Sequence, residues 1–175
     1  MNPEDRNTLL AYARTCVQAA MERGTLPELR NPSPPLSAFG AAFVTLRSRG
    51  NLRGCIGQMQ AMTSLWKSVR DMAEASATRD PRFSPLQPGD PFQVEISIIS
   101  DSFSISPDQV RVGTHGLIVE REGLRGMLLP HVAIENDWTA TRFLEQTVLK
   151  AGLPKEAIDD PNLELRAFTA ELISE

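Results

Sequence analysis

The chain has 175 residues, of which 41 % are hydrophobic and 23 % charged, and its formal net charge is −4. This length fits one domain over residues 1–175, or one domain with a second, smaller lobe, and it is enough to bury a hydrophobic core. The acidic balance argues against strong binding to nucleic acid, which usually needs a basic face. A local cluster of arginines is still compatible with binding a small anion.

The sequence predicts a cytoplasmic protein that does not associate with a membrane. The first residues, Met1 to Asp5, are acidic and lack the apolar core of a signal peptide. No apolar run approaches the about 20 residues that are needed to span a bilayer. The two cysteines, Cys16 and Cys55, are too few for a disulfide framework, so we expect both thiols to be reduced.

The first predicted element is a helix that Asn2 caps, with Pro3 in its first turn and Gly24 as its stop. Apolar residues recur at helical spacing through this segment, and Cys16 lies among them. We therefore expect Cys16 to be a core residue. The proline-rich segment from Pro27 to Pro35 is predicted to be an extended strap on the surface.

Two β-hairpins are predicted. Phe39–Leu46 and Leu52–Gln58 flank the turn residues Arg49-Gly50-Asn51, and Gly116–Glu120 and Leu124–Leu129 flank Glu122-Gly123. Each second strand begins with Leu-Arg-Gly just past the turn. This similarity is too short to establish an internal repeat and is also compatible with similar turn chemistry alone.

The remaining segments complete an α+β pattern. The sequence predicts a helix capped by Thr63 or Ser64, a strand over Phe92–Ser100, a helix from Thr139 to a stop at Gly152, a helical turn over Pro154–Ile158 and a final strand over Leu163–Leu172. Strands and helices do not alternate regularly, as they would around a parallel sheet. We therefore expect a mainly antiparallel sheet flanked by helices, with room for a smaller subdomain.

The stretch Leu52–Gly57, here called the Cys55 motif, is the main candidate site. In an extended strand Arg53 and Cys55 share one face, and a guanidinium beside a thiol favours the reactive thiolate. Gly54 and Gly57 leave room for a ligand or for another backbone segment. The alternative is that the motif is a tightly packed inner strand, because free cysteines are often buried.

Other candidate residues carry weaker signals. The segment Arg79–Phe83 is either an anion clamp or a solvated loop with a local ion pair between arginine and aspartate. Glu95 is a base or ligand partner, or more often the solvent side of a half-buried strand. His115 and His131 are the only imidazoles that can serve as a base for Cys55. Cysteines and histidines show no metal-ligand spacing, so no metal site is predicted.

The chain resembles the AMMECR-type domain family, named for a human chromosomal region linked to Alport syndrome, midface hypoplasia and elliptocytosis. The resemblance rests first on the Cys55 motif. Further matching stretches follow in order: Asp80-Pro81-Arg82-Phe83, Val94-Glu95-Ile96-Ser97, His115-Gly116-Leu117-Ile118-Val119-Glu120, Leu128-Leu129-Pro130, Trp138 and Lys150-Ala151-Gly152-Leu153-Pro154. The match covers nearly the whole chain.

The resemblance implies an α+β fold with a smaller subdomain and a functional site at the Cys55 motif. It implies no established reaction and leaves the cofactor unknown. Microbial relatives are often fused to, or encoded beside, a Memo-like domain and a radical S-adenosylmethionine protein, which implies a shared pathway. This chain has His131 where relatives frequently have Gln and Val148 where they frequently have Cys. The first difference argues against His131 as a base that the whole family requires. The second argues against a second essential thiol in the last long helix.

Two functions therefore remain open. The first is a thiol-based enzyme component or small-anion-binding enzyme, with Cys55 as nucleophile and Arg53, Gly54, Gly57 and Arg82 around the substrate. His131 and His115 are weak candidates for its base. The second is a non-catalytic protein-interaction module in which the Cys55 motif packs the hairpin.

Overall fold

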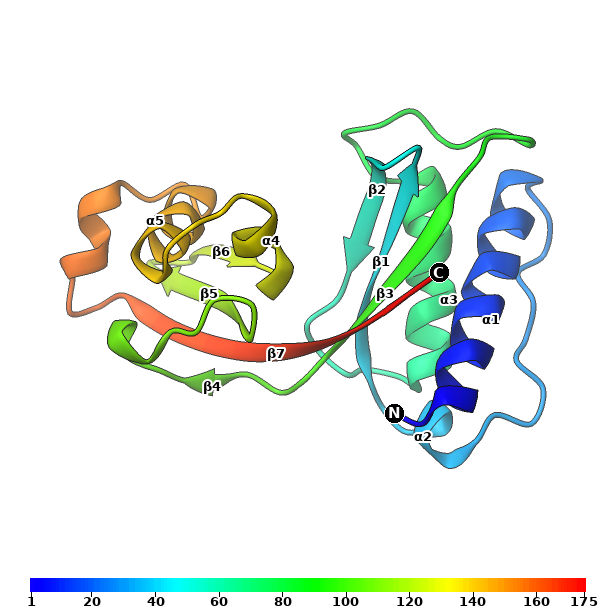
Figure 1. The fold of residues 1–175 in the computed structure, drawn as a ribbon, viewed down its shortest axis with the longest axis horizontal. Coiled ribbons are helices and arrows are strands. Elements are labelled where there is room, and N and C mark those ends of the chain that lie inside the picture. Colours follow the sequence, from blue (N-terminus) through cyan, green and yellow to red (C-terminus); the bar gives the residue numbers. More distant parts are fainter. The chain divides into compact units, whose positions relative to one another are not determined.

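The computed structural model describes residues 1–175 and divides into two compact units. Unit 1 comprises Met1–Ile99 and Glu171–Glu175, and unit 2 comprises Ser100–Ala170 (Figure 1). Both units combine helices with antiparallel strand pairs, which confirms the predicted α+β class. The strand β7 (Glu164–Ser174) has residues in both units.

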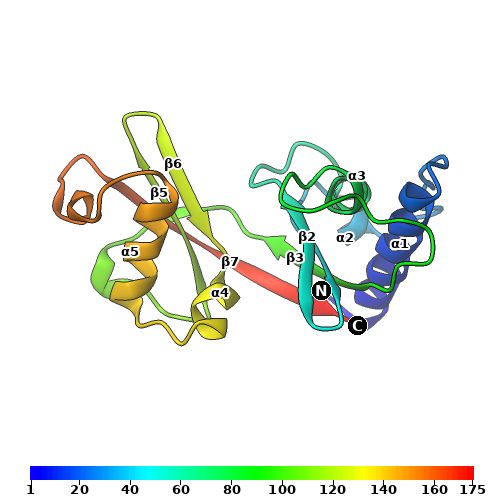
Figure 2. The ribbon, with the colours of Figure 1, turned by 90° about the horizontal axis from the view of Figure 1, so that it is seen from above.

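Unit 1 is a sheet with helices on one face. Its strands lie in the order β2-β1-β3-β7, and Figure 2 shows α1 and α3 on the same side of β2 and β3. Apolar residues of the helices and of the inward-facing strand positions form one core, for example Leu9, Val44 and Val69. The elements are α1 (Pro3–Met21), α2 (Pro34–Ser37), β1 (Ala41–Ser48), β2 (Asn51–Gly57), α3 (Leu65–Thr78) and β3 (Gln93–Ile99).

The hairpin of β1 and β2 confirms the predicted antiparallel pairing. Its turn places Arg49 and Gly50 at φ values of 50° and 80°, the left-handed conformation that two-residue hairpin turns require. The register then shifts, because Leu46 pairs with Gly54 while Arg47 pairs with Leu52. Arg53 is therefore the extra residue of a β-bulge, a feature that changes the direction of side chains along a strand.

Unit 2 has its own sheet and core. The strand order is β7-β5-β6, with β4 pairing β7, and α5 packs against β5 and β6. Leu117, Val119 and Phe143 are among its fully buried residues. The elements are β4 (Phe103–Ser104), the 3₁₀ helix η1 (Pro107–Gln109), β5 (His115–Arg121), β6 (Leu124–Leu128), α4 (Pro130–Glu135), α5 (Ala140–Lys150) and the 3₁₀ helix η2 (Lys155–Asp159).

The two units share one plan. Each has a hairpin, then helix, then a strand that pairs antiparallel with the first strand of the hairpin: β1 with β3, and β5 with β7. The Leu-Arg-Gly similarity has a structural counterpart, because each glycine faces a helix backbone. A Cβ added to Gly54 would lie 2.1 Å from the carbonyl oxygen of Ser76, and one added to Gly126 would lie 2.5 Å from that of Thr147.

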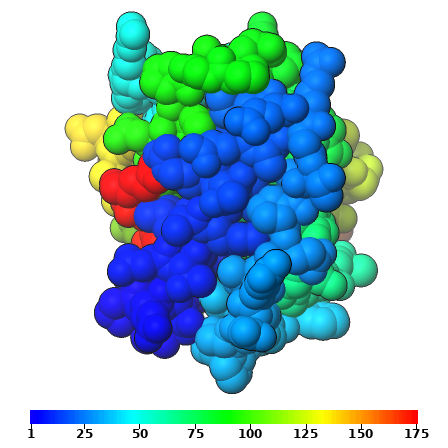
Figure 3. Space-filling view, turned by 90° about the vertical axis from the view of Figure 1, so that its right-hand side faces the viewer, coloured from blue at the N-terminus to red at the C-terminus, as the bar shows by residue number.

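The segment after α1 lies against that helix, as predicted for a surface strap. The hydroxyl of Tyr12 donates to the carbonyl oxygen of Pro27 at 2.8 Å, and the hydroxyl of Ser33 donates to Asp5 at 2.6 Å. Figure 3 shows α1 in dark blue with the following segment in lighter blue beside it. The strap is not wholly extended, because Pro34–Ser37 forms the short helix α2.

Several boundaries differ from the sequence-based expectation. Helix α1 ends at Met21 because Arg23, rather than Gly24, takes the left-handed conformation that terminates it, with φ 54°. The short helix α4 and the short strand β4 were not predicted, and η2 is a 3₁₀ helix shifted one residue along the chain. None of the helices is both long and apolar enough to cross a membrane.

Candidate functional site

The thiol of Cys55 lies on β2 opposite Thr45 of β1. Val44 and Leu46 point into the core, so Thr45 lies on the sheet face that the helices do not cover. The hydroxyl of Thr45 donates a hydrogen bond to Cys55 Sγ at 3.2 Å, and Cys55 itself is half-buried. A donor to sulfur stabilises the thiolate relative to the thiol.

The loop that follows α3, Asp80–Ser84, reaches back to this thiol-bearing strand. Asp80 Oδ2 accepts the amide N–H of Cys55 at 2.8 Å. The guanidinium of Arg82 binds the same carboxylate with two hydrogen bonds, Nε to Oδ1 at 2.9 Å and Nη2 to Oδ2 at 2.7 Å. Arg82 Nη2 also donates to the carbonyl oxygen of Cys55 at 3.2 Å. Asp80 and Arg82 thus clamp the backbone of Cys55 through its N–H and its carbonyl oxygen.

Asp80 and Arg82 each shift the pKa of the other. Hydrogen bonds from Arg82 hold the pKa of Asp80 at about 2, with further help from the backbone N–H groups of Cys55 and Arg82 and against the effect of burial. The side chain of Asp80 is only 2 % exposed, whereas that of Arg82 is 54 % exposed. The pKa of Arg82 is raised, chiefly by Asp80 and to a smaller extent by Cys55. The guanidinium of Arg82 thus lies beside Cys55, 3.2 Å from its carbonyl oxygen, while its charge is partly balanced by Asp80.

Arg53 is the extra residue of the β-bulge and contacts the loop that follows α3. Its Nη1 donates to the carbonyl oxygen of Ser84 at 2.7 Å. Arg53 and Arg82 therefore both hold the Asp80–Ser84 loop against β2.

The two glycines of the Cys55 motif make close contacts within unit 1. Gly54 faces the backbone of α3 at Ser76, and a Cβ at Gly57 would lie 2.1 Å from the ring of Phe43. The hydroxyl of Ser76 accepts the N–H of Ile56 at 2.9 Å and donates to the carbonyl of Val44 at 2.7 Å. For Gly54, the sequence allowed either a ligand or another backbone segment to approach, and the structure shows the backbone.

The two histidines lie outside unit 1. His115 and His131 belong to unit 2, whereas Cys55 belongs to unit 1. His115 Nδ1 accepts the N–H of Arg111 at 3.2 Å, and His131 lies in α4.

Glu95 lies in the same cross-strand row as Cys55, because β3 places it opposite Thr45 on the other side of β1. Its carboxylate accepts from Nε of Arg47 at 2.9 Å. The structure thus gives Glu95 a cationic partner within the sheet of unit 1.

Cys16 is a core residue, as predicted. It is fully buried in α1, and burial raises the pKa of its thiol to about 11. The sequence-based interpretation did not single out Thr45 or Ser76. A two-residue turn at Arg49 and Gly50 would by itself place Val44 opposite Cys55, and the bulge at Arg53 brings Thr45 there instead. Neither Thr45 nor Ser76 therefore has a local signal in the sequence.

Comparison with known proteins agrees with the resemblance noted in the sequence. The AMMECR1 family profile matches residues 10–173. The chain belongs to the AMMECR1 family. A protein of Methanothermobacter thermautotrophicus is 37 % identical, with 100 % of this chain and 96 % of that protein aligned. Protein NEQ441 of Nanoarchaeum equitans is 33 % identical, with 95 % and 98 % aligned.

The AMMECR1-family fold is also seen in a solved structure. The crystal structure of protein PH0010 from Pyrococcus horikoshii has a TM-score of 0.93 to this chain at 32 % sequence identity, covering 98 % of this chain and 92 % of that one. The family membership and the α+β fold predicted from the sequence are therefore confirmed.

Proposed function

We propose that this AMMECR1-family protein is a thiol-dependent enzyme component that binds a small anion at Cys55. The observation that carries the proposal is a half-buried thiol that accepts a hydrogen bond from Thr45, on a residue whose carbonyl oxygen the guanidinium of Arg82 contacts. Cys55 is the nucleophile or acceptor. Arg82, which remains half-exposed, attracts the anionic group of the substrate.

The remaining predicted residues have supporting roles in this proposal. Arg53 positions the Asp80–Ser84 loop, and through it Arg82, because it donates to Ser84. Gly54 and Gly57 fix the strand close to α3 and under Phe43. His115 and His131 stay candidates for a base, although a thiolate that is stabilised by a hydroxyl and a guanidinium does not require one for its formation.

A non-catalytic role is the alternative, and one observation favours it. The contacts of Gly54 and Gly57, and the clamp of Asp80 and Arg82 on the Cys55 backbone, are also what a purely structural motif needs. In that case the protein acts as an interaction module. The Memo-like and radical S-adenosylmethionine proteins suggested by the family resemblance are the first partners to test by co-purification.

Alkylation distinguishes these two functions. We expect the rate of iodoacetamide modification of Cys55, followed by peptide mass mapping, to rise at a lower pH than that of a free thiol such as glutathione. Cys16 is the internal control for slow labelling, because it is buried and its pKa is raised. A Cys55 midpoint equal to or above that of glutathione contradicts the activated thiol and favours the interaction module.

A matched pair of variants identifies the source of the activation. Arg82→Gln removes the guanidinium beside Cys55 and is expected to move the alkylation midpoint to higher pH. Arg79→Gln is the control, because this neighbouring arginine binds Glu74 on the surface of α3. Circular dichroism checks that both variants are folded. Equal midpoints for the Arg82 variant and the native protein rule out the proposed role of Arg82.

A further inference from the structure

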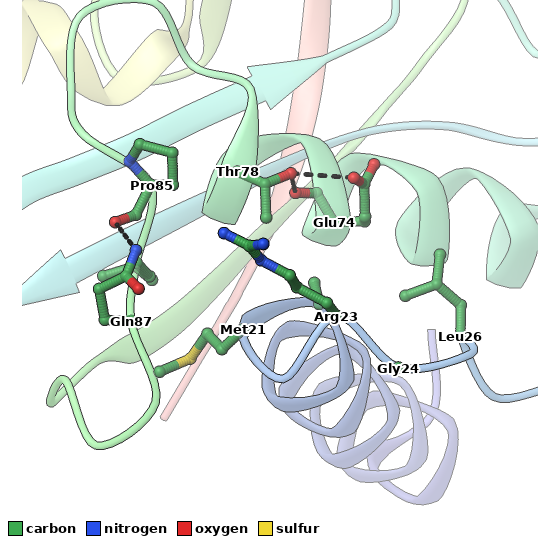
Figure 4. A pocket seen from close by; sticks show the side chains of 10 residues that line it. Met21, Arg23, Gly24, Leu26, Glu74, Thr78, Pro85 and Gln87 are labelled. Atoms are coloured by element: carbon green, nitrogen blue, oxygen red, sulfur yellow. Dashed lines mark hydrogen bonds between the residues drawn. The ribbon is translucent and has the colours of Figure 1, made fainter.

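A second candidate site lies in unit 1 where α1 and α3 end. A pocket of about 480 Å³ is bounded by the end of α1, the end of α3 and the segment 85–87 (Figure 4). This volume lies within the range of small-molecule sites. Residues of the Cys55 motif do not line this pocket.

The backbone at the edge of the pocket holds Arg23 in an unfavourable conformation. The N–H of Arg23 donates to Ala20 at 3.1 Å and that of Gly24 to Ala19 at 2.9 Å, which together close the end of α1. Arg23 takes φ 54°, a conformation in which glycine is strongly preferred, although Gly24 is the next residue. The chain therefore places a charged side chain where glycine is the less strained choice.

The guanidinium of Arg23 has no carboxylate partner in the chain. Figure 4 shows its side chain pointing from the end of α1 into the space between Thr78 and Gln87. The acidic residue of the pocket, Glu74, is bound by Thr78 and Arg79. It accepts from the hydroxyl of Thr78 at 2.9 Å and from Nε of Arg79 at 3.0 Å. Arg23 thus presents a positive charge and a planar set of donors to the pocket.

Met21 and Leu86 form the buried floor of the pocket, with only 7 % and 3 % of their surface exposed. The accessible apolar surface comes from the partly buried Leu26 and the exposed Pro85. The amide of Gln87 donates one N–H to the carbonyl oxygen of Pro85 at 3.2 Å, and the amide group has a second N–H. The pocket therefore combines one cation, one amide and a hydrocarbon surface.

We propose that this pocket binds a small monocarboxylic acid with a short hydrocarbon tail. The carboxylate pairs with the guanidinium of Arg23, whose fork fits two carboxylate oxygens. The tail lies over the pocket floor, against Leu26 or Pro85, the apolar lining residues that keep exposed surface. This site is separate from Cys55 and goes beyond the proposed thiol function, so either one can fail without the other.

Titration followed by two-dimensional ¹H–¹⁵N NMR tests this site with hexanoate as the probe. We expect saturable shifts in the millimolar range at the amides of 21–26, 78 and 86–87, as is usual for so small a ligand. Acetate, which lacks the tail, and hexylammonium, which has the opposite charge, are expected to bind at least about tenfold more weakly. Absence of saturable shifts at these amides, or equal binding of hexylammonium, overturns the proposal.

Two matched variants separate the charge of Arg23 from its backbone role. Arg23→Gly removes the guanidinium but suits the left-handed backbone, so we expect a folded protein whose hexanoate affinity falls at least about tenfold. Arg49→Gly makes the same change at another left-handed position, in the turn between β1 and β2, and is expected to leave the affinity unchanged. Undiminished binding by the Arg23 variant contradicts the assigned role of Arg23.

Discussion

The carboxylate of Asp80 and the guanidinium of Arg82 form a two-bond pair in which the acid is buried and the base is half-exposed. Asp80 also accepts the N–H of Cys55, so this pair joins the end of α3 to the edge strand β2. Because Arg82 stays half-exposed, its guanidinium loses little hydration on folding. The buried carboxylate of Asp80 is compensated by hydrogen bonds from Arg82 and from the N–H of Cys55. This pair fixes the backbone on which the proposed reactive thiol is carried.

Replacement of Asp80 by alanine is expected to be strongly destabilising. It leaves the N–H of Cys55 and the inner side of Arg82 without an acceptor, and we expect the free energy of unfolding to fall by about 3 kcal/mol. Urea unfolding measures this change. Asp71→Ala is the control, since Asp71 forms a surface pair with Arg70 and is 46 % exposed; its loss should change stability by about 0–1 kcal/mol. Similar effects of the two substitutions would contradict the structural role of Asp80.

The same carboxylate predicts how stability depends on pH. Its pKa is about 2 in the folded protein and 3.8 as its ordinary value. Because the folded pKa is the lower one, Asp80 contributes its stabilisation above 3.8, and this is lost as the pH falls through 3.8 towards 2. The contribution is on the order of 2 kcal/mol.

A comparison with Asp80→Asn isolates this contribution from those of other acids. We expect the difference in unfolding free energy between the native protein and the variant to narrow by about 2 kcal/mol on going from neutral pH to the folded pKa. Urea unfolding at a series of pH values gives the difference. If the difference in unfolding free energy stays constant over this pH range, the pKa of Asp80 is not lowered by folding.

Thr45→Val tests the hydroxyl that faces the thiol. Valine keeps the shape and removes the donor at 3.2 Å from Cys55 Sγ, so we expect the alkylation midpoint of Cys55 to move to higher pH. The control is Thr15→Val on the exposed side of α1, where the hydroxyl only donates to the carbonyl of Ala11. An unchanged midpoint in the Thr45 variant shows that the hydroxyl does not support the thiolate.

Gly54→Ala tests the close approach of β2 to α3. A Cβ there would lie 2.1 Å from a backbone oxygen, which cannot move without displacing the helix, and we expect a loss of about 3 kcal/mol or more in urea unfolding. Gly24→Ala is the matched control, because its Cβ would meet backbone at 3.5 Å, an ordinary contact. It should change stability by less than about 1 kcal/mol.

Local patterns in the sequence were sufficient for most of the fold. Asn2 and Thr139 cap α1 and α5 with hydrogen bonds to Asp5 and Arg142, and both hairpins pair as their turns predict. Helix α4 was missed because it is a single short turn-like element with no repeating apolar face. The stop of α1 was misplaced because glycine is the usual residue in the left-handed position, and here Arg23 occupies it.

The sequence predicted contacts of the candidate site only between residues that are close together in the chain. The importance of Asp80 depends on its contact with Cys55, 25 residues away, and that of Ser76 on its contact with Ile56, 20 residues away. No periodicity in the sequence encodes such contacts. Strand alternation also gave no sign that Arg53 would be a bulge residue whose guanidinium donates to Ser84, 31 residues away.

The division of β7 between the two units has a consequence for synthesis on the ribosome. Residues Glu171–Glu175 belong to unit 1, where Ile173 joins the core and Glu175 accepts the N–H of Val94 at 3.0 Å and binds Arg14 at 2.6 Å. These residues are translated after all of unit 2. Unit 2 is continuous in sequence, so it has its full complement of residues before unit 1 does. The first part of the chain to emerge is therefore the last to complete its native contacts.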